Sequence, residues 1–289
     1  MPVLQPNTSD IRNIATFVAE LNRQPQHHVG YLGDAPDEIG QALNDLDRPI
    51  AGAFRIVNND EQIVGVLGFE ADETLARAWM YGPWIEHTDW HVVSDQLFTA
   101  VAPLVPAAVN NLEIFCNKDN TRCAAFAQRH NFAPHGEHVI LRFPRAALAA
   151  LPPTGAQDVA GYEQQMQALH DRVFPGTYYS GEQIIGRLNA ERRVFVVVND
   201  TTLLGYAYVE AKPAFGEGSI EFVGVDERAR GKGVGGRLMA AALQWLFSFD
   251  AMQAITLTTN ADNTPALALY RRTGFQTLHT MQGWRRLRV

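Results

Sequence analysis

The sequence predicts an α/β (α+β) protein made of two domains of similar architecture in tandem. Its length of 289 residues suits two domains better than one, because each can bury its own core. Helical and strand patterns follow one another in the same order in both halves, and short motifs recur at matching places. A segment of small residues with two prolines, Ala146–Gly155, separates the halves. We therefore expect domains at 1–145 and 156–289, with 146–155 as the linker.

Apolar periodicity and turn residues place the elements of the first half. Thr8-Ser-Asp10 provides a cap for the first helix. The expected elements are a helix at Ile11–Arg23, a helix at Asp37–Leu46, strands at Ile50–Val57, Gln62–Glu70 and Ala76–Ile85, a helix at Val92–Leu104, a strand at Leu112–Cys116, a helix ending at Arg129 and a strand at Val139–Phe143.

The second half repeats this order. The expected elements are helices at Val159–Val173 and Glu182–Ala190, strands at Val194–Val198, Leu203–Glu210 and Ile220–Val225, a long helix from Gly235, a strand at Ile255–Thr259, a helix at Asn263–Arg272 and a closing pair of strands. Asn117-Lys-Asp-Asn120 in the first half parallels Asn260-Ala-Asp-Asn263 in the second. The repeat therefore extends to individual residues.

Composition excludes several classes of protein. The net charge is −7, with 10 Lys and Arg against 18 Asp and Glu in the first 150 residues, so no basic face for nucleic acid is expected. The acidic half favours a cationic amine as a partner, although a solvated acidic surface is the alternative. Cys116 and Cys123 lack metal-ligand spacing and are expected to be reduced thiols, with no metal site. No segment predicts a leader peptide or a membrane span, so we expect a cytoplasmic protein.

A glycine cluster lies where the Ile220–Val225 strand ends and the long helix begins. Glycines at 231, 233, 235 and 236 leave room for an anion beside the free N–H groups of the first helical turn. Arg230, Lys232 and Arg237 add positive charge around this turn. The stretch therefore predicts a site for a phosphorylated cofactor.

Three other interpretations of this cluster find less support in the sequence. Gly231-x-Gly233-x-x-Gly236 fits the dinucleotide pattern G-x-G-x-x-G, but the charged segment Asp226–Arg230 separates it from its strand. A Walker A sequence is absent. A glycine-rich loop that only turns the chain remains the plain structural alternative.

Two motifs resemble those of the GCN5-related N-acetyltransferases. Arg230-Gly-Lys-Gly233-Val-Gly235 matches R/Q-x-x-G-x-G/A, and the segment from Asn263 to Phe275 matches N-x-x-A-x-x-L-Y-x-x-x-G-F. The whole chain resembles a tandem pair of such domains, as in the mycothiol synthase type of architecture. The resemblance implies that each half is a mixed, mostly antiparallel, twisted sheet flanked by helices.

The resemblance also implies acetyl-CoA as the acyl donor. Its expected binding residues are Val223, Val225, Arg230, Gly231, Lys232, Gly233, Val234, Gly235, Gly236, Asn263, Ala266 and Tyr270.

Tyr270 matches the family's general acid, since a phenol can protonate a departing thiolate; a core tyrosine is the alternative. Glu221 is the candidate base, because it alternates in phase with Val223 and Val225, and Ser219 lies on the same face. An ordinary edge glutamate is the alternative for Glu221. Tyr178 and Tyr179 lie in the loop that borders the acceptor site in this family, where they are either acceptor contacts or packing residues.

The first half lacks these features. Glu86, His87, Asp89 and Trp90 stand where the second half has Arg230 and its glycines, and Ala127 stands where the second half has Tyr270. Carboxylates and bulky rings would oppose a diphosphate there. We therefore expect the 1–145 domain to be degenerate.

The sequence thus predicts an N-acetyltransferase that acetylates a primary amine, expected to be a small molecule, in the 156–289 domain. A protein or peptide N-acetyltransferase, a non-catalytic acyl-CoA sensor and an aminoacyl-tRNA-dependent transferase remain alternatives. We expect a monomer in which the two domains form an intramolecular pseudo-dimer.

Overall fold

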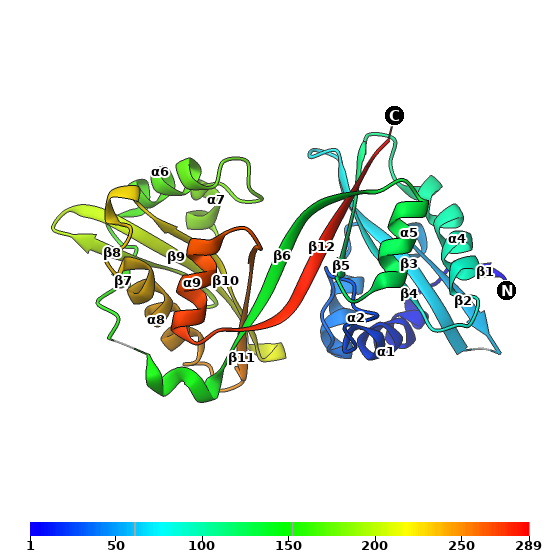
Figure 1. The fold of residues 1–289 in the computed structure, drawn as a ribbon, viewed down its shortest axis with the longest axis horizontal. Helices are drawn as coiled ribbons and strands as arrows, with labels where there is room; N and C mark the ends of the chain where they lie inside the picture. The colour runs from blue at the N-terminus through cyan, green and yellow to red at the C-terminus, as the bar shows by residue number, and fades with distance from the viewer. Residues whose placement is uncertain (61, 152, 289) are drawn as a thin grey trace. The chain divides into compact units, whose positions relative to one another are not determined.

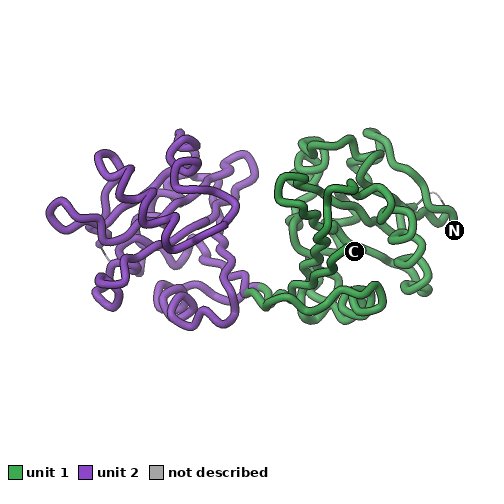
Figure 2. Tube along the Cα trace, turned by 90° about the horizontal axis from the view of Figure 1, so that it is seen from above, with its two compact units in different colours: residues 1–138, 279–289 green, residues 139–278 purple. Residues whose placement is uncertain are grey.

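The computed structural model describes residues 1–60, 62–151 and 153–288. The chain forms two compact units, shown in Figures 1 and 2. Unit 1 comprises Met1–His138 and His279–Val289, and unit 2 comprises Val139–Leu278. Each unit is an α/β structure with a mixed, mostly antiparallel sheet, which confirms the predicted fold class.

Unit 1 has the predicted order of elements from α1 to β6, with two elements, β1 and α3, that were not expected. Its elements are β1 (Val3–Leu4), α1 (Ile11–Asn22), α2 (Pro36–Asn44), α3 (Ile50–Ala53), β2 (Phe54–Asn59), β3 (Gln62–Asp72), β4 (Arg77–Ile85), α4 (Trp90–Val101), β5 (Asn111–Asn117), α5 (Thr121–Arg129), the start of β6 (Ala133–Pro144) and most of β12 (Gln276–Leu287). The strand order is β1-β2-β3-β4-β5-β12, with β6 beside β12. Only β4 and β5 run parallel among the pairs described there.

Unit 2 repeats this arrangement. Its elements are β7 (Gln157–Asp158), α6 (Glu163–Val173), α7 (Gly181–Gly186), β8 (Arg192–Asn199), β9 (Thr202–Lys212), β10 (Glu217–Val225), α8 (Val234–Leu246), β11 (Ala254–Asn260) and α9 (Thr264–Thr273). The strand order is β6-β11-β10-β9-β8-β7. The β10–β11 pair is parallel, as the β4–β5 pair is in unit 1.

Two long strands have residues in both units. β6 begins in unit 1 and ends in unit 2, whereas β12 begins in unit 2 and ends in unit 1. Within unit 1, β12 pairs antiparallel with β5 from Met281↔Asn117 to Leu287↔Asn111. The compact units therefore divide the chain differently from the expected domains at 1–145 and 156–289, because each half gives its last strand to the other unit.

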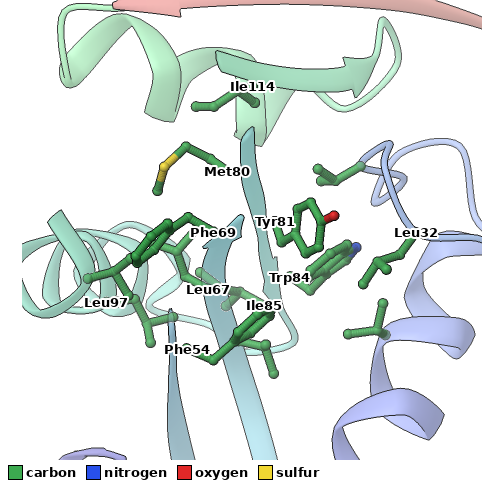
Figure 3. Close-up of a cluster of buried hydrophobic side chains, with 14 of the residues drawn as sticks. Leu32, Phe54, Leu67, Phe69, Met80, Tyr81, Trp84, Ile85, Leu97 and Ile114 are labelled. Atoms are coloured by element: carbon green, nitrogen blue, oxygen red, sulfur yellow. The ribbon is translucent and has the colours of Figure 1, made fainter. Parts of the chain in front are cut away.

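Apolar side chains cover both faces of each sheet. In unit 1, Phe69 and Met80 face Leu97 of α4, while Trp84 and Leu32 lie on the opposite side of the sheet (Figure 3). In unit 2, one cluster joins α8 to β6 and the other joins α6 and α7 to the opposite face. The second face is the more polar of the two and includes the buried tyrosines Tyr206 and Tyr208.

Four local expectations differ from the structure. Thr8–Asp10, expected to cap the first helix, forms a 3-10 helix that Asn7 caps, and Asp10 makes no side-chain cap bond to α1. Residues Ile50–Ala53, expected to begin a strand, form a helical turn before β2. Pro49 precedes this turn, and its two buried residues, Ile50 and Ala53, are three apart and so lie on one side of the turn. The expected closing pair of strands is the single strand β12. The first half of the expected linker 146–155 lies in a 3-10 helix, Arg145–Ala150, and Pro152 and Val289 lie outside the described residues.

Candidate functional site

The parallel strands β10 and β11 separate near the middle of unit 2. Their pairing comprises Glu217↔Ala254, Gly218↔Ile255 and Ser219↔Thr256, although β10 continues to Val225. On its other edge, β10 stays paired with β9 as far as Val225↔Gly205. The edge of β10 from Ile220 onward therefore faces a gap in the sheet, which we call the unit 2 gap.

The glycine cluster forms the turn into α8, as the sequence predicts. Gly231 and Gly233 have φ of +75° and +80°, a conformation that side chains rarely adopt. A Cβ added at Gly231, Gly233 or Gly236 would meet nothing within 4 Å. Gly233 is the N-cap of α8 and provides no side-chain cap for the first-turn N–H groups. The turn thus presents open space beside free backbone donors.

Gly235 has a different role from its neighbours. A Cβ there would lie 2.9 Å from Cδ2 of Leu269, so this glycine allows α8 to pack closely against α9. The packing places the start of α8 beside the helix that carries Tyr270.

The basic residues around the turn divide into two groups. Arg230 and Lys232 are exposed and have no ion pair among the described residues, so their charge is available beside the turn. Arg237 instead donates its Nε–H to the carbonyl of Thr154 at 3.1 Å and also bonds the carbonyl of Gly155. Arg237 is therefore held by the segment that precedes β7, and its guanidinium is not free beside the turn, where its charge was expected.

Helix α9 carries the second motif. Asn263 caps it by accepting the N–H of Ala266 at 3.2 Å, and Gly274 ends it with φ of +112°. The Tyr270 ring packs in the α8 cluster together with Leu269, Val223 and Val225. Burial raises the pKa of Tyr270 to about 12. Its hydroxyl has no hydrogen-bond partner within the described chain and stays protonated at neutral pH.

A β-bulge in β10 changes the expected orientation of Glu221. Ile220 pairs with Val209 and Phe222 with Tyr208, so Glu221 is the extra residue. After the bulge, Val223 and Val225 pack on the α8 side, whereas Glu221 bonds residues on the α6 and α7 side. The prediction that Glu221 shares a face with Val223 and Val225 is therefore wrong, because strict alternation fails at a bulge.

Both carboxylate oxygens of Glu221 accept hydrogen bonds. The Tyr178 hydroxyl donates to Oε2 at 2.5 Å, and the Ser219 hydroxyl donates to Oε1. The Tyr178 ring is 55% exposed and packs against Phe222 with the ring centroids 5.0 Å apart. Desolvation and the Glu221 charge raise the pKa of Tyr178 well above its ordinary value. Ser219 therefore lies beside Glu221 as the sequence predicts, and Tyr178 covers that carboxylate.

A second carboxylate, Glu210, lies on the same face and was missed from the sequence. It accepts from the Tyr208 hydroxyl at 2.5 Å and forms ion pairs with Arg187 and Arg192 at 3.2 and 3.3 Å. Burial opposes ionisation, but the bonds from Tyr208 and Arg187 keep the pKa of Glu210 below its usual value. Finding Glu210 required the register Glu210↔Ser219, for which the sequence gives no direct signal.

Tyr179 connects this cluster to helix α6. The Arg187 guanidinium lies over its ring, with Cζ 4.2 Å from the centroid. The buried His170 contacts the Tyr179 carbonyl through Nε2 at 2.8 Å and the Tyr206 hydroxyl through Nδ1 at 2.5 Å. The loop that carries Tyr178 and Tyr179 is therefore anchored to α6 through His170.

The site has two faces that meet at the unit 2 gap. The α8 face offers backbone donors, two unpaired cations and the Tyr270 hydroxyl. The α6–α7 face offers the Glu221 carboxylate and polar side chains. Such an arrangement can bind an anionic cofactor from one side and a cationic partner from the other.

The corresponding residues of unit 1 lack this chemistry. Trp90 is buried at the start of α4, and Ala127 is buried in α5. Glu86 and Asp89 lie just before α4, where unit 2 has its basic residues.

Comparison with known proteins shows which class the site resembles. Residues 163–275, which carry the glycine turn and α9, match the model described as the Acetyltransferase (GNAT) family. The fold is that of tandem GNAT proteins. A tandem GNAT protein from the clavulanic acid biosynthesis pathway has a TM-score of 0.68 and 15% identity, covering 99% of this chain and 98% of its own. A GCN5-related N-acetyltransferase from Sphaerobacter thermophilus has a TM-score of 0.74 and 16% identity, covering 99% and 95%.

Curated relatives match over a shorter stretch. The mycothiol acetyltransferase of Arthrobacter sp. (strain FB24) is 39% identical over 77 residues, which cover 25% of this chain and 24% of the relative. The mycothiol acetyltransferase of Saccharomonospora viridis is 35% identical over 99 residues, covering 32% and 29%. The aligned stretches thus span less than a third of these relatives. No helix within the described ranges is long and apolar enough to cross a membrane.

Proposed function

We propose that the protein is an acetyl-CoA-dependent N-acetyltransferase whose active site is the unit 2 gap and whose acceptor is a small primary amine. One observation carries the proposal: the gap has an uncapped helix start with open space on one face and a hydrogen-bonded carboxylate on the other.

The residues of the α8 face fit a CoA diphosphate. The space beside Gly231, Gly233 and Gly236 would be filled by a Cβ, and the adjoining N–H groups suit phosphate oxygens. Arg230 and Lys232 would add charge, and the free edge of β10 at Val223 and Val225 would bind the cofactor's amide arm. Val234, Gly235, Ala266 and Asn263 would shape this face, with Asn263 acting through its cap of α9.

When bound, acetyl-CoA would supply the acetyl thioester. Glu221 would orient the acceptor ammonium and take its proton, with Ser219 holding the carboxylate. Tyr270 would give the hydroxyl proton to the leaving sulfur, since its phenol is protonated at working pH. The N–C bond would form as the C–S bond breaks, and the second proton that the nitrogen loses on becoming an amide would pass through solvent and restore the Tyr270 phenol. Glu221 and Tyr270 would thus act from opposite faces of the sheet.

Two considerations favour a small amine over the alternatives. The relatives that align with this chain are named for acetylation of mycothiol, a small molecule. The carboxylate on the acceptor face suits an amine, and a purely acyl-CoA-binding sensor would not need it. A protein or peptide amine remains the second acceptor class, and the match to the GNAT family model argues against the dinucleotide interpretation of the glycine cluster.

An amine-library screen tests the proposal. The full chain is incubated with acetyl-CoA and each amine, while free thiol release and the mass of the product are followed. We expect thiol release that depends on a small amine and stops in the Gly233→Asp variant. Binding of acetyl-CoA without amine-dependent release across small amines and peptides would support the sensor instead.

A further inference from the structure

The gap of unit 1 that corresponds to the unit 2 gap is filled by the chain itself. Pairing of β4 with β5 comprises Arg77↔Asn111, Ala78↔Leu112 and Trp79↔Glu113. Beyond these pairs, the segment His28–Gly30, which we call the plug, lies along the edge of β5.

Backbone hydrogen bonds attach the plug to β5. Val29 forms an antiparallel bridge with Cys116. The Gly30 N–H donates to the Phe115 carbonyl at 2.6 Å, and the Asn117 N–H donates to the His28 carbonyl at 3.0 Å. The edge that β4 has left is therefore paired as in an ordinary sheet. In unit 2, Tyr178 of the loop after α6 instead contacts Phe222. Among the described residues, the edge of β11 that faces β10 has no partner beyond Thr256.

The side chain of Asn22 in α1 holds the plug through hydrogen bonds. Its side-chain oxygen accepts the Val29 N–H at 3.0 Å and the Trp84 indole N–H at 2.7 Å. Its amide nitrogen donates to the Leu32 and Gly33 carbonyls at 3.0 and 2.9 Å. Asn22 is 1% exposed, so these four bonds satisfy a buried amide completely. Figure 3 shows Trp84 directed toward the loop at Leu32.

The plug also fits tightly. A Cβ at Gly30 would lie 2.5 Å from Cδ1 of Phe115, so even a methyl group lacks room. The ring of His28 stacks on His279 of β12 with 4.2 Å between centroids. Asn117 bonds His279 at 3.0 Å, so the plug and β12 hold each other in unit 1.

β4 lacks a donor where unit 2 has one. Ile63-Val-Gly65 in β3 matches Leu203-Leu-Gly205 in β9, so the next residues, Val66 and Tyr206, occupy equivalent positions. Val66 pairs with Trp84, and Tyr206 pairs with Gly224. Pro83, which precedes Trp84, therefore corresponds to Val223, which precedes Gly224. Proline has no backbone N–H and cannot bind an amide arm as Val223 can.

We infer that residues His28–Gly30 are the built-in occupant of the unit 1 gap, so that unit 1 does not take acyl-CoA and uses its gap to anchor β12. The inference rests on the proposed function for the matching site in unit 2. A single chain then binds one acetyl-CoA.

Calorimetric titration combined with hydrogen exchange tests this inference on the full chain. We expect a stoichiometry of one, with acetyl-CoA slowing exchange in β10, the glycine turn and α9 but not in peptides covering 26–33 and 111–120. The Gly233→Asp variant should bind none. A stoichiometry of two, or ligand-induced protection of 26–33 in either protein, would overturn the inference. Lack of amine acetylation with these binding results intact would refute only the proposed function.

A second variant tests the plug without any ligand. Asn22→Ala removes the side chain that makes four buried bonds, so exchange at 26–33 should accelerate by at least ~10-fold, while peptides of unit 2 stay unchanged. Asn13→Ala on the exposed face of α1 is the matched control. Equal exchange in wild type and Asn22→Ala would show that the segment is not held as a plug.

Discussion

At the scale of single residues, Tyr270 combines a partly buried ring with a hydroxyl that makes no hydrogen bond in the described part of the chain. Such a hydroxyl is available to a ligand. We predict that Tyr270→Phe lowers kcat by ~10²–10⁴-fold while the acetyl-CoA Kd changes little. Because the pKa of Tyr270 is about 12, its titration should not limit the rate below that pH.

The measurement is pre-steady-state acetylation followed by thiol release, so that product release does not mask the chemical step. Tyr162→Phe is the matched control, because that hydroxyl donates to the Asp200 carbonyl and has no other partner in the described part of the chain. Full activity of Tyr270→Phe would reject the general-acid role.

Removing the Tyr178 hydroxyl should improve acceptor binding, whereas removing the Tyr270 hydroxyl should slow catalysis. Its hydroxyl occupies the Glu221 oxygen that an acceptor ammonium would need. Tyr178→Phe removes this competitor and keeps the ring on Phe222, so the acceptor KM should fall by about 2- to 10-fold, less than a full hydrogen bond to a charged group is worth. Tyr178→Ala, which also removes the ring, should raise it. Steady-state kinetics with a fixed amine measures both, and a raised KM in Tyr178→Phe would make the hydroxyl an acceptor contact instead.

At the scale of elements, the turn from β10 into α8 provides the cofactor site through its backbone. Gly233→Asp would add a carboxylate and strain at φ of +80° beside the free N–H groups. We predict that the thermal shift induced by acetyl-CoA disappears. Gly161→Asp is the matched control, since Gly161 has φ of +85° and nothing within 4 Å of its Cβ position, outside the glycine turn. A shift that persists in Gly233→Asp, with folding intact, would remove the turn from the site.

At the scale of the whole molecule, the exchanged strands decide which fragments can fold. A fragment of residues 151–289 lacks β6, whose Val139, Leu141 and Phe143 are buried in the core of unit 2. Its β12 also loses β5 as a pairing partner. Losing Phe143 alone would cost about 3–5 kcal/mol by analogy with large-to-small core substitutions. We predict that 151–289 is insoluble or lacks a cooperative melt, whereas 139–278 is soluble and melts cooperatively. Circular dichroism of both fragments checks this, and a stable 151–289 fragment would contradict the unit boundaries.

The sequence by itself determined the order of the main elements, the glycine turn, the end of α9 at Gly274 and the two acetyltransferase-like motifs, because these depend on residues close together in the chain. Tertiary structure alone decided the face of Glu221, since a bulge arises from pairing with β9. It also decided the Glu210 cluster, the exchange of β6 and β12, and the plug in unit 1. Each of these joins segments far apart in sequence through backbone pairing, whose register no local pattern encodes.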